Sequence, residues 1–175
     1  MKKLVVIGLS VLALAGCRGP ATLEPMTDFD ANAASIINKK GSGTVSGQAF
    51  LKQAGGGVVT CAGNEVALIP ATDYATQRLR MIFGSSDYGY KDQFTQDVTK
   101  AKNGSYYEMR RYAVCDAQGN FVFKEVASGT YYLMTSVLWG VTQYRNAGGS
   151  LMHKVEVKNG RNSEVLMTDK FIDDA

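Results

Sequence analysis

Residues 115–131 read CDAQGNFVFKEVASGTY, and this stretch decides the predicted fold. The segment from Asp116 to Asn120 carries the Asp, Gly and Asn residues that favour tight turns. Residues 121–123 then predict a short strand, and residues 131–138 predict another after the Ser-Gly-Thr of 128–130. The stretch therefore has the pattern of short strands separated by tight turns.

The same signals extend over most of the chain on both sides of this stretch. Apolar and polar positions alternate with a period of two from residue 44 to residue 51, which is typical of a strand. Lys158-Asn159-Gly160-Arg161 predicts a hairpin turn between strands at 151–157 and 163–168. Repeated short strands with Gly and Asn turns favour an all-β sandwich or a small barrel, and the further strands are expected at 58–61, 66–69 and 106–115.

A motif in the quoted stretch is similar to the D-x-x-G-x-F-x-F…G-x-Y signature of carboxypeptidase regulatory-like domains. The resemblance covers residues 44–168 and implies an all-β fold, a transthyretin-like antiparallel β-sandwich of about seven strands. The motif positions are folding residues that make the tight turn, enter the core and return the chain to it: Asp116, Gly119, Phe121, Phe123, Gly129 and Tyr131. The motif therefore predicts a fold and assigns no activity.

Residues 71–105 interrupt this resemblance as a partly helical insertion. Apolar residues at 75, 79 and 82 follow Thr72-Asp73 with helical spacing, and those at 94, 98 and 101 repeat the pattern. Connections of this length in a compact domain are often binding elements. The last residues, 169–175, are expected to form a frayed C-terminus.

The N-terminal residues 1–16 read MKKLVVIGLSVLALAG, in which two lysines precede an apolar run. The run is too short to cross the ~30 Å hydrocarbon core of a bilayer. It matches the apolar region of a secretory signal peptide, and we expect residues 1–16 to be cleaved.

The sequence Leu14-Ala15-Gly16-Cys17 resembles the lipobox of bacterial lipoproteins. The resemblance implies a mature chain that begins at Cys17 and carries covalent diacylglyceryl and N-acyl lipid there, with no other cofactor. Residue 18 is Arg and not the Asp associated with inner-membrane retention in that class. An outer-membrane location follows, with the periplasmic leaflet favoured over the cell surface.

Residues 17–43 are expected to form a lipidated tether with a short helix. Acidic residues at 28 and 30 and lysines at 39 and 40 are helix start and stop signals. Apolar residues at 29, 33 and 36 or 37 share one face of this helix. Such a face more often packs on its own domain than docks a partner.

Beyond Cys17, the chain contains Cys61 and Cys115, an even pair. In an oxidising compartment an even pair favours a disulfide, and two buried free thiols are the alternative. A bridge would close a loop of about 55 residues and stabilise the fold by about 4 kcal/mol on the chain-entropy model.

Charge and residue types argue against several function classes. The formal net charge is +3, and loss of Lys2 and Lys3 with the signal peptide would leave 17 − 16 = +1, which argues against a nucleic-acid partner. The single histidine, His153, excludes a multi-histidine metal site and lies in a predicted strand. No catalytic motif is recognisable, so we expect neither an enzyme nor a metal site.

Tyrosines are the most suggestive surface feature, because their rings supply contact area at low entropic cost. The side chains proposed to contact a partner lie in or beside the insertion: Tyr74, Arg78, Tyr88 and Tyr90. Other rings that could join such a surface are Tyr106, Tyr107, Tyr112, Tyr144 and Trp139. The expected function is a lipid-anchored, non-catalytic envelope protein that binds a membrane or periplasmic protein. The alternative is a module that binds an envelope glycan, either peptidoglycan or another polysaccharide.

Overall fold

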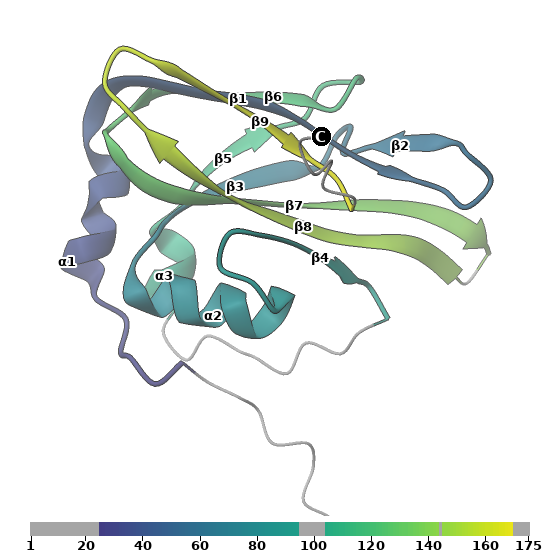
Figure 1. Cartoon of the computed structure of the whole chain (residues 1–175), viewed down its shortest axis with the longest axis horizontal. Helices are drawn as coiled ribbons and strands as arrows, with labels where there is room; N and C mark the ends of the chain where they lie inside the picture. Colours follow the sequence, from purple (N-terminus) through teal and green to yellow (C-terminus); the bar gives the residue numbers. More distant parts are fainter. Residues whose placement is uncertain (1–24, 95–103, 144, 170–175) are drawn as a thin grey trace, which may run out of the picture.

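The computed structural model describes residues 25–94, 104–143 and 145–169, which form two β-sheets with short helices on one side (Figure 1). The first sheet contains β1 (Lys40–Lys52), β2 (Val58–Thr60), β6 (Asn120–Val126) and β9 (Asn162–Met167). The second has the order β4 (Tyr88–Asp92), β8 (Arg145–Val157), β7 (Gly129–Thr142), β3 (Glu65–Pro70) and β5 (Arg111–Val114). The predicted β-sandwich is therefore confirmed. The described residues hold nine strands instead of about seven.

The main core lies between the two sheets. Alternating residues of each strand point inward, as the period of two requires. Phe121, Phe123 and Tyr131 are all buried there, and the two phenylalanine rings pack edge to face with centroids 6.3 Å apart. The motif positions expected to enter the core thus lie in it.

A second, smaller core forms on the outer face of the five-stranded sheet, where the helices cover it (Figure 1). The helix α2 (Asp73–Phe83) begins after Thr72, whose Oγ1 accepts a hydrogen bond from the Ala75 N–H at 3.2 Å. It ends at Gly84, which adopts a left-handed φ of 76°. The helix predicted from residues 75, 79 and 82 is confirmed, and residues 98 and 101 of the second pattern lie outside the described residues.

The N-terminal part of the described chain packs against the domain. A single turn, α1 (Ala31–Ala34), is followed by a 3₁₀ helix (Ser35–Asn38), so the helical segment is shorter than expected. Asp30 caps α1, and Ala34 and Ile37 are buried. β1 begins at Lys40, before the strand start expected at residue 44. The apolar face of this segment is therefore used by its own domain.

The predicted hairpin at residues 158–161 is not formed between two neighbouring strands. β9 pairs in parallel with β1 in the other sheet. Hydrogen bonds direct the chain there, because the Thr44 N–H donates to the Arg161 carbonyl and the Gly160 N–H donates to Ser42 Oγ, both at 3.0 Å. The prediction of a turn at these residues is confirmed, but the turn carries the chain from one sheet to the other.

The strand predicted over residues 106–115 is also wrong in its first half. Residues Ser105–Glu108 form the helical turn α3, and only Arg111–Val114 form β5. Tyr106 is buried in the second core, where its ring packs against Tyr74 at 5.1 Å and Phe29 at 5.8 Å. Burial of this ring overrides the alternating pattern of the local sequence.

None of the helices among the described residues has both the length and the apolar character needed to span a bilayer. The predicted signal peptide 1–16, the lipidation residue Cys17 and residues 170–175 of the predicted frayed end lie outside the described residues.

Candidate functional site

The turn that carries the sequence motif is held by one carboxylate. Asp116 Oδ1 accepts hydrogen bonds from the Gln118 and Asn120 backbone N–H groups at 2.9 and 2.8 Å, and Oδ2 accepts one from Asn120 Nδ2 at 3.0 Å. These bonds, led by that of the Asn120 side chain, lower the pKa of the exposed Asp116 carboxyl below its ordinary value. Asp116 is thus a structural residue.

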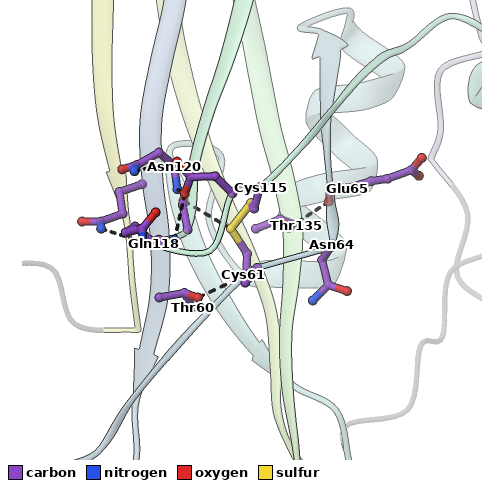
Figure 2. The surroundings of a disulfide bond; sticks show 12 residues. Thr60, Cys61, Asn64, Glu65, Cys115, Gln118, Asn120 and Thr135 are labelled. Atoms are coloured by element: carbon purple, nitrogen blue, oxygen red, sulfur yellow. Dashed lines mark hydrogen bonds between the residues drawn. A yellow bond between two sulfur atoms is a disulfide. The ribbon is translucent and has the colours of Figure 1, made fainter.

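The predicted disulfide is confirmed between Cys61 and Cys115 (Figure 2). Both residues are buried, and the Cα atoms lie 5.8 Å apart. The bridge joins the segment before β3 to the segment between β5 and the motif turn, so it fixes the edge strand β5 beside the first sheet.

The side chain of Tyr112 is held on the outer surface of this edge strand. In β5 the exposed and half-buried positions alternate, and Tyr112 and Val114 are 49% and 63% exposed. Ala113, between them, packs against the main core. The register places Tyr112 opposite Ala67, which lies in the second core, so the tyrosine belongs to the outer face of the five-stranded sheet.

A wide groove of about 1140 Å³ begins at Tyr112 and extends over the first sheet. We call it the Tyr112 groove. Its lining combines one exposed aromatic ring with amide, carboxylate and hydroxyl groups and with exposed aliphatic side chains. The polar side chains are Ser46, Gln48, Asp116, Asn120 and Glu164, and the exposed aliphatic ones are Val114, Val122 and Leu166.

A smaller pocket of about 260 Å³ lies between α2, β4 and the segment after α3. We call it the arginine pocket. Its charged and polar lining residues are Arg78, Lys91, Asp92, Gln93, Arg110 and Ser150. A third hollow, of about 270 Å³, shares Arg110 and Met134 with the arginine pocket and Tyr112 with the Tyr112 groove. The third hollow therefore lies between the Tyr112 groove at the β5 edge and the arginine pocket, which reaches β4.

Two tyrosine rings support the arginine of this pocket. The Arg110 guanidinium lies 4.3 Å from the Tyr106 ring centroid and 4.6 Å from that of Tyr107, within the range of cation–π contacts. Burial raises the pKa of the Tyr106 hydroxyl above its ordinary 10.0, and the nearby Arg110 and Arg78 charges partly oppose this rise. Tyr106 therefore stays neutral at physiological pH, and its ring is a platform for the guanidinium.

The four residues predicted to contact a partner do not form one surface. Tyr74 and Arg78 on α2 are each only 6% exposed, so little of either side chain is accessible to a partner. Tyr88 and Tyr90 lie on β4, at the opposite edge of the sheet from β5. Tyr90 is partly buried and donates to the Gly148 carbonyl at 3.2 Å. Burial and the Asp92 carboxylate raise the pKa of the Tyr90 hydroxyl.

Arg110, which the sequence analysis does not single out, lines two of the hollows. Local sequence could have indicated the exposure of Tyr112 through the alternation in β5, but not the proximity of strands distant in the chain. Tyr144 of the tyrosine set lies outside the described residues. In the described part of the chain, no three His, Cys, Asp or Glu residues are grouped so as to hold a metal ion.

No protein-family model and no curated protein match the chain. Among solved structures, it is similar to the crystal structure of a Pseudomonas aeruginosa protein that is provisionally described as carbohydrate binding. The two sequences are 25% identical, and the structures superpose with a TM-score of 0.66. The match covers 81% of this chain and 98% of that chain, so it includes the sandwich and not only one sheet.

Proposed function

We propose that this protein is a non-catalytic, glycan-binding module of the bacterial cell envelope, anchored by lipid at Cys17. The observation that carries the proposal is the Tyr112 groove, whose lining includes the exposed Tyr112 together with residues that carry amide, hydroxyl and carboxylate groups. The similarity to a protein described as carbohydrate binding supports the same class of ligand.

The groove has the chemical groups that sugars need. A pyranose presents an apolar face of C–H groups, which can lie on the Tyr112 ring, and a rim of hydroxyl groups. The side chains of Asn120 and Gln48 offer amide donors and acceptors, and Glu164 offers a carboxylate acceptor. Because the groove is large and open, it suits part of a glycan chain better than an enclosed small molecule.

Substitution of Tyr112 by alanine is expected to weaken glycan binding by about 2 kcal/mol, or roughly 30-fold in Kd, because the exposed aromatic ring of the groove is lost. The measurement is co-sedimentation of the full chain with purified peptidoglycan, together with titration against a panel of immobilised polysaccharides. Since Tyr112 is exposed on an edge strand, the melting temperature should change little.

Tyr88→Ala is the matched control, because Tyr88 is 42% exposed on the other edge strand and lines none of the three hollows. It should bind like the wild type. Equal losses in both variants, or a loss only in Tyr88→Ala, would remove the Tyr112 groove as the binding site.

The lipid anchor rests on the lipobox resemblance and has its own test. Cys17→Ser is expected to yield a protein that lacks acyl chains and retains residues 1–16, because the thiol is the acceptor of the diacylglyceryl group. Intact-mass analysis of membrane and soluble fractions reads both features. Normal cleavage of the variant without acylation would contradict the lipoprotein assignment.

A protein partner is the second candidate, favoured by the exposed aliphatic side chains in the groove, Val114, Val122 and Leu166. A photoreactive residue at position 112 would distinguish the two classes in cells. One dominant protein adduct would support a scaffold role, whereas glycan adducts or competition by added glycan would support the first proposal.

A further inference from the structure

The arginine pocket contains more positive than negative side chains. Within the described residues its lining holds three cations, Arg78, Lys91 and Arg110, and one carboxylate, Asp92. Asp92 Oδ1 already accepts a hydrogen bond from the Phe94 N–H at 2.8 Å, and the Tyr90 hydroxyl lies 3.3 Å from Oδ2. The pocket is therefore suited to an anionic group.

One of these cations is nearly buried. Arg78 is 6% exposed, and its Nη2 donates to the Tyr107 hydroxyl at 3.4 Å. Its guanidinium also lies 5.7 Å from the Tyr106 ring centroid. A positive charge held at this depth strengthens the attraction for an anion, because the surrounding protein screens less than water.

Arg110 presents the part of its guanidinium that binds carboxylates. Its Nε donates to the Tyr106 carbonyl at 3.3 Å, and the Tyr106 and Tyr107 rings fix the plane of the group. Across residues 25–94, 104–143 and 145–169, Nη1 and Nη2 of Arg110 make no hydrogen bond, and no carboxylate forms an ion pair with it. Two parallel N–H groups on a preset plane match the geometry of a carboxylate.

The size and position of the pocket indicate what carries that anion. About 260 Å³ is less than the roughly 300–1,000 Å³ of pockets for drug-sized ligands, so the pocket suits one sugar residue. Arg110 lies two residues before Tyr112, which corresponds to about 7 Å along an extended chain. A glycan that contacts the Tyr112 ring can therefore place a neighbouring unit against Arg110.

We propose that the arginine pocket binds the carboxylate of an acidic sugar residue within the glycan, with Arg110 as its bidentate partner and Arg78 and Lys91 as supporting charges. The inference rests on the proposed function and narrows it from glycans in general to glycans that contain acidic sugar residues.

The test compares two forms of one probe, trigalacturonate and its fully methyl-esterified form, in which each carboxylate is replaced by a neutral methyl ester. The full chain is titrated calorimetrically in a detergent without a sugar headgroup. Esterification should weaken binding to the wild type by about tenfold or more, because a charge-assisted bidentate contact is lost. In Arg110→Gln the two probes should bind with similar, weak affinity.

Arg80→Gln is the matched control, because Arg80 is an exposed arginine of the same helix α2 and does not line the pocket. It should retain the preference for the acidic probe. Lys91→Gln should weaken the preference for the acidic probe. It replaces Arg110→Gln as the test variant if thermal melting shows that Arg110→Gln does not fold.

Equal binding of the acidic and esterified probes to the wild type would overturn the acidic-sugar inference and leave the glycan-binding proposal standing. A preference for the acidic probe that persists in both Arg110→Gln and Lys91→Gln would overturn the inference in the same way. If no probe and no immobilised polysaccharide bind the wild type, both proposals are wrong. Selective loss of the acidic preference in the pocket variants would support the inference.

Discussion

Gly119→Val is expected to destabilise the fold by about 3 kcal/mol or more, measured by thermal or denaturant unfolding. Gly119 adopts a φ of +82°, which disfavours any residue with a side chain. A Cβ added there would also lie 2.7 Å from the Ala49 carbonyl oxygen and 2.9 Å from Thr60 Cβ. The turn cannot move away, because the Ala49 N–H donates to the Gly119 carbonyl at 3.0 Å and ties it to β1.

The control separates strain in the backbone from steric overlap. Gly160 also has a left-handed φ, +69°, but a Cβ there would meet nothing within 4 Å. Gly160→Val should therefore cost only the conformational part, about 1–2 kcal/mol. Equal losses at the two glycines would show that the packing of the turn against β1 contributes little.

Replacement of Cys61 and Cys115 together by alanine is expected to reduce the free energy of unfolding by about 4 kcal/mol. The bond joins residues 54 apart in the sequence, so its absence frees a long loop in the unfolded chain. Both cysteines are buried, so the space left by the two sulfur atoms adds to the loss in the folded state.

Two measurements check this expectation. Non-reducing intact-mass analysis of protein matured in an oxidising compartment should show the loss of two hydrogens. Full reduction of the wild type should lower its stability by about as much as the double substitution does. Free thiols at both positions, or a change in stability below about 1 kcal/mol, would contradict a stabilising disulfide.

The parts of the fold that could be predicted from sequence are those with local signals. The turn at 116–120 carries its own capping carboxylate and its left-handed glycine, and α2 carries Thr72 before it and Gly84 after it. In each case the residues that begin and end the element lie next to it in the sequence. Such signals do not depend on how distant strands pair.

The predictions that were wrong concern elements whose structure depends on tertiary contacts. The alternation at residues 106–115 continues through α3, and only burial of Tyr106 against Tyr74 and Phe29 selects the helical turn. Likewise, the turn at 158–161 suits a hairpin, and the Thr44–Arg161 hydrogen bond that redirects it joins residues that are far apart in the chain. Local propensity cannot distinguish these outcomes.

In the candidate site, too, local signals could be predicted from the sequence and tertiary contacts could not. Tyr112 can be predicted to be exposed from the alternation within β5, but the first sheet supplies the rest of its groove, through residues such as Gln48 and Glu164. The buried position of Arg78 follows from the packing of α2 on the sheet, which sequence periodicity alone does not determine.

The parallel pairing of β1 with β9 has a consequence for how the protein is made. Since the first strand of the sandwich depends on the last, the first sheet cannot be completed until residue 167 has been synthesised. A nascent chain therefore has an open sheet edge along β1, where it is exposed to aggregation and available to chaperones. Order of synthesis thus delays completion of the first sheet until the last strand of the domain has been made.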